Sequence, residues 1–105
     1  METTKLRITQ NAERKRFELD TDGKLSIIEY IQMHPDTIAL THTEVHPDLE
    51  GQGVGSRLVR GVLELLEQQN KKVMPFCSFV AAYIRRHPEW MRIVSDEYDD
   101  NEADF

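Results

Sequence analysis

The chain has 105 residues, enough for one compact domain and too few for two. Its formal net charge of −6 argues against nucleic acid as a partner, and its single cysteine, Cys77, excludes an intramolecular disulfide and a cysteine-rich zinc site. No apolar run is long enough to span a membrane, and the first residues do not resemble a signal peptide. We therefore expect a cytoplasmic protein without a membrane partner, and we expect it to be a monomer.

The first half of the chain is rich in β-forming residues interrupted by turn signals. Residues 16–19 and 24–33 predict two strands, and the Asp-Thr-Asp-Gly sequence at 20–23 predicts the turn that pairs them as a hairpin. After His-Pro-Asp at 34–36, residues 37–45 predict a third, strongly β-branched strand. A meander of three antiparallel strands is the expected arrangement.

His42 lies inside the third predicted strand. Regular alternation puts its side chain on the same face as Ile38 and Leu40. A functional histidine and a core histidine with satisfied hydrogen bonds both fit this placement. His46 follows four residues later on a strand, and no third ligand is evident, so we expect no metal site.

Three glycines alternate between a predicted strand and a predicted helix: Gly51, Gly53 and Gly55. Glycines allow backbone N–H groups to approach an anion, and the N-terminus of the helix at 56–69 adds unpaired donors and partial positive charge. A P-loop is excluded because no Lys precedes Ser56, and a dinucleotide fingerprint is excluded because position 58 is Leu. The pattern predicts a phosphate-binding loop, with a tight structural connection as the competing interpretation.

The second half of the chain predicts a strand, a helix and a further short helix. Residues 71–76 predict the strand, which should pair in parallel with the third strand through a right-handed crossover. Ser78 is a suitable N-cap for a helix that ends before His-Pro at 87–88, and residues 89–94 predict a short helix. Cys77 precedes the helix N-terminus, where a thiolate is stabilised; a buried, inert cysteine is the competing interpretation.

The domain organisation follows from the ends of the chain. We expect residues 1–95 to form a single compact domain, in which residues 1–12 either add an edge strand or remain loose. Residues 96–105 are acidic and lack a packing pattern, so we expect a disordered tail there.

The segment from Val45 to Ser56 resembles motif A of the GNAT acyl-CoA-dependent N-acetyltransferases, whose signature is Arg/Gln-x-x-Gly-x-Gly/Ala. Gly53 and Gly55 match the two signature glycines, whereas Glu50 stands at the Arg/Gln position and departs from the pattern. The chain is more specifically similar to small, single-domain GNAT proteins of the YjdJ type. This resemblance covers residues from about 15 to about 94 and is carried by His-Thr-Glu-Val at 42–45, by Gly-Gln-Gly-Val-Gly at 51–55 and above all by residues 73–84 with His-Pro-Glu-Trp at 87–90.

The resemblance implies an α+β fold in which two central parallel strands of a mixed sheet splay apart. It also implies acetyl-CoA as cosubstrate, with the pyrophosphate on the backbone N–H groups of residues 52–56 and the pantetheine bonded to the main chain of Val45. Glu50 is then expected to point away from the loop. The implied cofactor-binding residues are Val45, Gly51, Gln52, Gly53, Val54, Gly55, Ser56 and Tyr83.

The resemblance further implies Cys77 as a candidate catalytic thiol, with His42 as its companion. Tyr83 could protonate the leaving thiolate or simply pack in the core. In a direct route, His42 or Glu44 would deprotonate the acceptor amine. In a covalent route, Cys77 would take the acetyl group first. The sequence does not choose between these routes.

The leading function is transfer of acetyl from acetyl-CoA to an amine whose identity the sequence does not give. The alternative is a CoA-binding or acetyl-CoA-binding regulatory module with little or no catalysis. This alternative stands because the chain lacks the N-terminal helices that usually build the acceptor pocket of the superfamily. A third possibility is an interaction domain that uses only the fold and binds no CoA.

Overall fold

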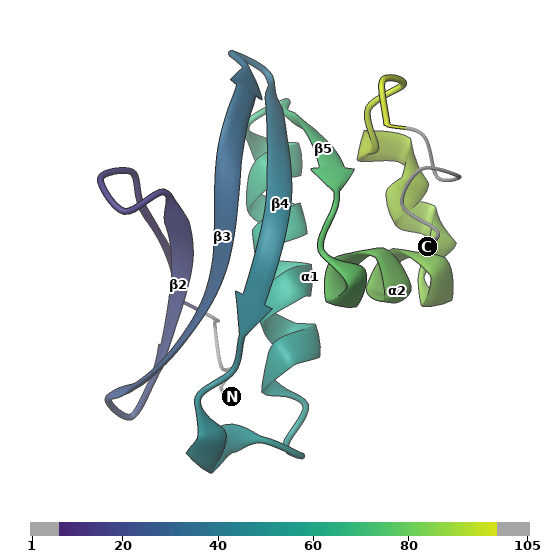
Figure 1. The fold of residues 1–105 in the computed structure, drawn as a ribbon. Helices are drawn as coiled ribbons and strands as arrows, with labels where there is room; N and C mark the ends of the chain where they lie inside the picture. Colours follow the sequence, from purple (N-terminus) through teal and green to yellow (C-terminus); the bar gives the residue numbers. More distant parts are fainter. Residues whose placement is uncertain (1–6, 99–105) are drawn as a thin grey trace.

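The structure is a computed structural model that describes residues 7–98. A five-stranded sheet forms its centre, in the order β1-β2-β3-β4-β5 (Figure 1). The first four strands pair antiparallel and β5 pairs parallel to β4, which confirms the expected mixed sheet. The strands are β1 (Ile8–Asn11), β2 (Arg16–Thr21), β3 (Lys24–His34), β4 (Thr37–Glu44) and β5 (Lys72–Pro75).

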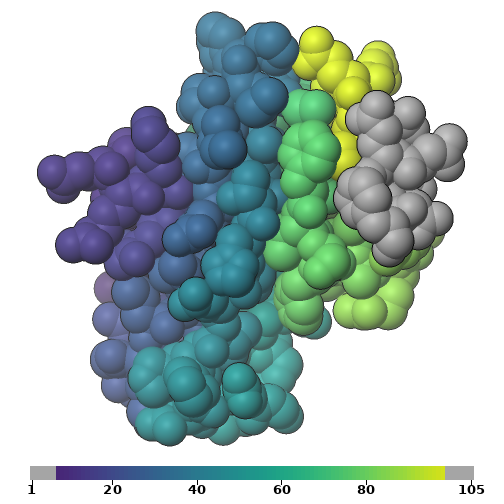
Figure 2. Space-filling model, in the orientation of Figure 1, coloured from purple at the N-terminus to yellow at the C-terminus, as the bar shows by residue number. Residues whose placement is uncertain are grey.

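The helical elements follow β4 and β5. They are the 3-10 helix η1 (Pro47–Leu49), the helices α1 (Val54–Gln68) and α2 (Ser78–Arg86), and the 3-10 helix η2 (Pro88–Ile93). α1 crosses behind the sheet from β4 to β5, and no helix of the described residues covers the opposite face of β3 and β4 (Figures 1 and 2). None of the described helices is long and apolar enough to cross a membrane.

The core lies between α1 and the sheet. Most apolar side chains of α1 lie on one face of the helix and are buried against the sheet, whereas Leu65 is half-buried. At its C-terminus, α1 ends before Asn70, whose φ of 59° is the left-handed conformation that terminates helices. The main buried contributors are Phe17, Ile28, Ile38, Leu40, Leu58, Val59, Val62, Leu63, Leu66 and Val73.

The turn between β2 and β3 forms as predicted. Asp22 and Gly23 both have positive φ, 53° and 84°, which is the geometry of a two-residue type I′ hairpin. The Gly23 N–H donates to the Asp20 carboxylate at 2.7 Å, so the side chain also holds the turn. The preceding strand, β1, forms the edge of the sheet beside β2.

A β-bulge at Thr41 changes which residues of β4 face the core. Leu40 pairs with Tyr30 but His42 pairs with Glu29, so Thr41 is an extra residue in β4. The Thr41 hydroxyl donates to the Glu29 carbonyl at 3.3 Å. The prediction that His42 shares a face with Leu40 is therefore wrong, because it assumed unbroken alternation.

The chain after β5 departs from the prediction in detail. Cys77, not Ser78, is the N-cap of α2, and its side chain makes no capping hydrogen bond. Residues beyond η2 run beside β5, where the Ser95 N–H donates to the Val73 carbonyl at 2.9 Å. The first residues of the predicted disordered tail also make contacts: Glu97 pairs with His34 at 3.0 Å, and the Tyr98 ring packs edge-on against Phe76. Residues 99–105 of that tail, like residues 1–6, lie outside the described residues.

Candidate functional site

The loop between η1 and α1 leaves the first backbone amides of the helix without helical partners. Gly51 and Gly53 take positive φ of 81° and 77°, and Gly53 is the N-cap of α1. The first hydrogen bond of α1 runs from the Arg57 N–H to the Gly53 carbonyl, so the amides of Val54, Gly55 and Ser56 have no helical partner. These amides and the helix dipole form a site suited to an anion.

Gln52 takes a different part in this loop from the one predicted. Its backbone N–H donates to the Leu49 carbonyl at 3.3 Å, and its side-chain amide donates to the Asp48 carbonyl at 3.2 Å. Both groups therefore hold the turn together. An anion cradle at residues 53–56 stays a prediction, and the Gln52 N–H predicted to belong to it is engaged within the loop.

A cavity of about 380 Å³ opens above this loop. A Cβ on Gly51 or Gly53 would meet nothing within 4 Å, so the space above these glycines is open. At Gly55 the opposite holds: a Cβ would lie 2.7 Å from the Phe79 ring and 3.3 Å from the Val45 side chain. The cavity is lined by Val45, Leu49, Glu50, Gly51, Gly53, Val54, Gly55, Ser56 and Phe79.

β4 and β5 separate next to this cavity. Their parallel pairing ends at Leu40 and Pro75, and the Cys77 N–H then donates to the Leu40 carbonyl at 2.8 Å. Beyond that point β4 continues to Glu44, while the chain after β5 turns into α2. On the side that faces β5, the part of β4 from Thr41 to Glu44 therefore has no strand partner among the described residues. The two strands leave an opening there.

Cys77 and Thr43 meet across this opening. The Cys77 Sγ and the Thr43 Oγ1 lie 3.2 Å apart, and Cys77 is only 7% exposed. Thr43 pairs with Ile28 of the core, because the bulge has turned it to that face. The sequence did not single out Thr43, and the only available signal was its place on a strand opposite the predicted cysteine.

His42 and Glu44 lie on the uncovered face of the sheet. The His42 Nε2 is 3.0 Å from the Glu44 Oε2, and both side chains are more than half exposed. The described contacts give Cys77 a partner in Thr43 and give His42 a partner in Glu44. The pairing of Cys77 with His42 that the resemblance implied is not seen in these contacts.

Tyr83 is buried in α2 and packs against His87, with ring centroids 4.3 Å apart. Burial raises the pKa of the Tyr83 phenol above its usual value, and a hydrogen bond from the Trp90 indole opposes this shift only weakly. The residue does not line the cavity above the glycine loop. A role as proton donor to a thiolate there stays a prediction.

The comparisons with known proteins decide the family. The sequence model of the GCN5-related N-acetyl-transferase family matches residues 16–93. The chain belongs to this family. Among its relatives is Protein NATD1, 20% identical over 88 residues in both Xenopus tropicalis and Danio rerio, where the match covers 82% of this chain and 81% and 80% of the relatives.

A solved structure supports the same assignment at the level of the fold. The NMR solution structure of a GCN5-like protein from Staphylococcus aureus superposes with a TM-score of 0.64 and 27% identity. The match covers 89% of this chain and 91% of that one. The GCN5-related fold predicted from the sequence is therefore confirmed.

Two charged residues shape the loop of this N-acetyltransferase family member. Arg57 is exposed, and its Nη2 donates to the Gln52 carbonyl at 3.3 Å, which holds a positive charge over the loop. Glu50, at the position where the family signature has Arg or Gln, lines the cavity. The predicted outward orientation of its carboxylate stays a prediction. The sequence gives no signal that connects Arg57 with the loop.

Proposed function

We propose that this protein binds acetyl-CoA at the glycine loop and transfers its acetyl group to an amine. The observation that carries the proposal is that residues 54–56, whose amides have no helical partner, line a cavity of about 380 Å³ beside the opening between β4 and β5. Members of the GCN5-related family generally use acetyl-CoA, and the described residues fit it. That the protein belongs to the small YjdJ-type group and that it lies in the cytoplasm both stay predictions.

The fit rests on three properties of the loop. The positive φ values of Gly51 and Gly53 keep the chain close beneath open space. The α1 N-terminus supplies unpaired donors for a pyrophosphate, and Arg57 adds a cation. Val45, whose side chain contacts this cavity, stands where β4 ends and is the residue proposed to bond the pantetheine.

The chemistry is proposed at Cys77. Acetyl-CoA supplies the acetyl group as an activated thioester. In the covalent route, the Thr43 hydroxyl positions the Cys77 sulfur, which loses its proton and attacks the thioester carbonyl. The C–S bond to CoA breaks and CoA leaves as its thiol. The amine then attacks the Cys77 thioester, which forms the amide and releases the Cys77 thiol. In the direct route, the amine attacks the thioester carbonyl itself, and the His42–Glu44 pair on the uncovered sheet face accepts the amine proton. The C–S bond breaks and CoA leaves as a thiolate that takes up a proton.

A second function is favoured by one specific observation. β1 and β2 are joined by residues 12–15 alone, so no helix stands between these strands to build an acceptor pocket. Such a protein would bind CoA or acetyl-CoA and catalyse little. An interaction domain that binds neither is the remaining class, and it would show no response to either ligand.

The first experiment is a thermal-shift titration with acetyl-CoA, CoA and ATP. A ligand at about 100 times its dissociation constant should stabilise the protein by roughly 2.7 kcal/mol. We expect a response to both CoA forms and a smaller one to ATP, which shares the adenosine and the phosphates but lacks the pantetheine arm. The absence of any response to CoA and acetyl-CoA would exclude both leading functions.

The second experiment separates the two routes. Once an amine substrate is found with a free-thiol assay, Cys77→Ala should abolish turnover in the covalent route and leave it intact in the direct route. Cys77→Ser is the matched control for packing, because it retains a polar atom of similar size near Thr43. Transfer that neither variant alters would eliminate the covalent route.

A further inference from the structure

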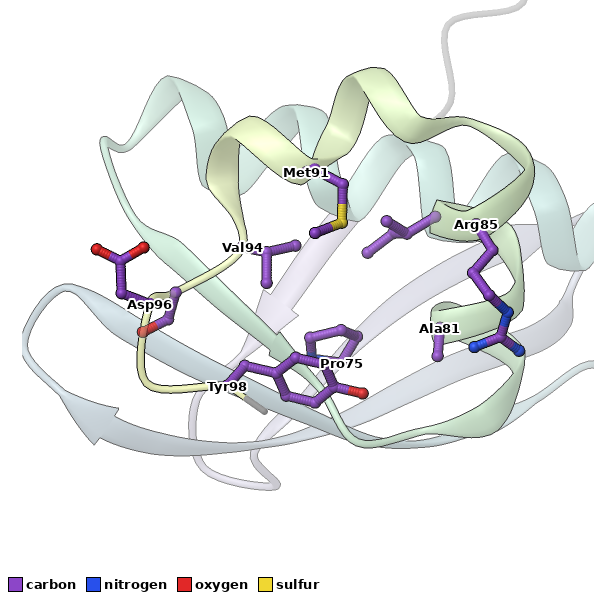
Figure 3. A pocket seen from close by; sticks show the side chains of 9 residues that line it. Pro75, Ala81, Arg85, Met91, Val94, Asp96 and Tyr98 are labelled. Carbon is purple, nitrogen blue, oxygen red and sulfur yellow. The ribbon is translucent and has the colours of Figure 1, made fainter. Parts of the chain in front are cut away.

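A second cavity, of about 300 Å³, lies between β5, α2, η2 and the chain that follows η2 (Figure 3). It shares no lining residue with the cavity above the glycine loop, and the proposed function does not use it. Its volume is at the lower end of the range of small-molecule sites. It is lined by Pro75, Ala81, Ile84, Arg85, Met91, Val94, Ser95, Asp96 and Tyr98.

The body of this cavity is apolar. The side chains of Met91 and Val94 point toward the Pro75 ring, and the Tyr98 ring lies beside Pro75 (Figure 3). Ile84 is buried and closes the cavity from α2. Burial of an apolar group among these side chains is favourable at roughly 25 cal/mol for each Å² removed from water.

The charged groups of the cavity lie at its two ends. The Arg85 guanidinium extends beside Ala81, on the side where the Tyr98 hydroxyl also ends, whereas Asp96 is at the opposite end (Figure 3). The ion pairs that arginines form within residues 7–98 involve Arg16, Arg60 and Arg92 and do not occupy Arg85. A guanidinium presents a planar set of donors that matches a carboxylate.

We propose that this cavity binds a small carboxylate with an apolar body. The carboxylate pairs with Arg85, and the apolar part packs between Pro75, Ile84 and Met91. One guanidinium in a cavity that also contains Asp96 suits a monoanion better than a doubly charged phosphate, because the carboxylate of Asp96 repels added negative charge. The inference stands independently of acetyl-CoA binding.

The test is an amide-NMR titration of the full chain with 3-phenylpropionate, using neutral 3-phenylpropanamide as the matched ligand. We expect saturable shifts at Ala81, Arg85 and Val94 with the carboxylate and much weaker binding of the amide. Equal binding of both ligands would refute the role of Arg85. If no amide shift saturates at 3-phenylpropionate concentrations up to about 20 mM, the weakest affinity expected for a ligand of this size, the site itself is refuted.

Variants on one helix provide the second comparison. Arg85→Gln should weaken carboxylate binding by about tenfold or more, since charge-assisted hydrogen bonds are lost. Arg86→Gln is the control, because Arg86 is the neighbouring exposed arginine and does not line the cavity. The same weakening in both variants would overturn the proposal. Shifts produced by acetyl-CoA at residues 53–56 should be the same in Arg85→Gln and in the unmodified protein, which keeps this test apart from that of the proposed function.

Discussion

Gly55 gives the sharpest prediction about how the glycine loop is built. Gly55 lies in the first turn of α1 with an ordinary helical backbone, so its lack of a side chain is not required by φ. Packing disfavours a side chain there, because a Cβ would lie 2.7 and 3.1 Å from two atoms of the Phe79 ring, which is 38% exposed and would have to shift. Gly55→Ala therefore introduces two opposing effects on the free energy of unfolding.

The magnitudes of these effects predict a change of sign. Overpacking costs about 1–3 kcal/mol, whereas Ala in place of Gly in a helix gains up to about 1 kcal/mol. With Phe79 present, Gly55→Ala should destabilise the protein by up to about 2 kcal/mol. In a Phe79→Ala background the clash is gone, and the same change should be neutral or stabilising by up to about 1 kcal/mol.

Urea unfolding of the four proteins in this double-mutant cycle measures the effect. The expected interaction energy between Gly55→Ala and Phe79→Ala is about 1–3 kcal/mol. Each kcal/mol shifts the Tm of a domain of this size by roughly 4–8 °C. Additive effects, with Gly55→Ala equally destabilising in both backgrounds, would refute the account of Phe79 as the neighbour that requires glycine. The Val45 contact at 3.3 Å would then become the explanation to test.

Three further predictions concern charge. Glu50→Gln should tighten CoA binding, and more so at low salt, because it removes the carboxylate of a residue that lines the cavity proposed to hold the pyrophosphate. Unchanged affinity in titration calorimetry would place that carboxylate outside the site. The Arg92 guanidinium hydrogen-bonds Glu67 and lowers the pKa of that carboxyl, so the pair stabilises the fold above the ordinary Glu pKa of 4.5 and loses this effect as pH falls. Glu67→Gln should therefore flatten the acid side of a Tm-versus-pH curve, and a curve that keeps its slope would contradict this. Burial raises the Tyr83 pKa, so the stability that the neutral phenol contributes is present below pH 10 and should be lost as the pH rises further. Tyr83→Phe should reduce this loss of Tm at alkaline pH. An unchanged loss would assign it to other groups.

The architecture could be predicted from the sequence because its patterns are local. The turn at residues 20–23 and the glycine loop before α1 each depend on a few neighbouring residues. The glycines likewise predicted a loop that leads into a helix N-terminus with unpaired donors. These features depend on backbone sterics and periodicity, which a single sequence carries in full.

The side-chain partners in the site could not be predicted in this way. The bulge at Thr41 has no clear sequence signal. It nevertheless turns the following residues of β4 to the opposite faces of the sheet and brings Thr43 rather than His42 to Cys77. The hydrogen bond of Arg57 to the loop depends on a rotamer and a turn geometry. The Tyr98 ring packs against the Phe76 ring, although the acidic composition after residue 95 predicted no packing there.

The central claim is that the amides at the start of α1 hold the phosphates of acetyl-CoA. An amide-NMR titration of the full chain with acetyl-CoA tests it most directly. The account predicts the largest shifts at residues 53–56, accompanied by shifts at Thr43 and Cys77 beside the opening. No response to acetyl-CoA, or shifts that leave residues 53–56 unchanged, would contradict it.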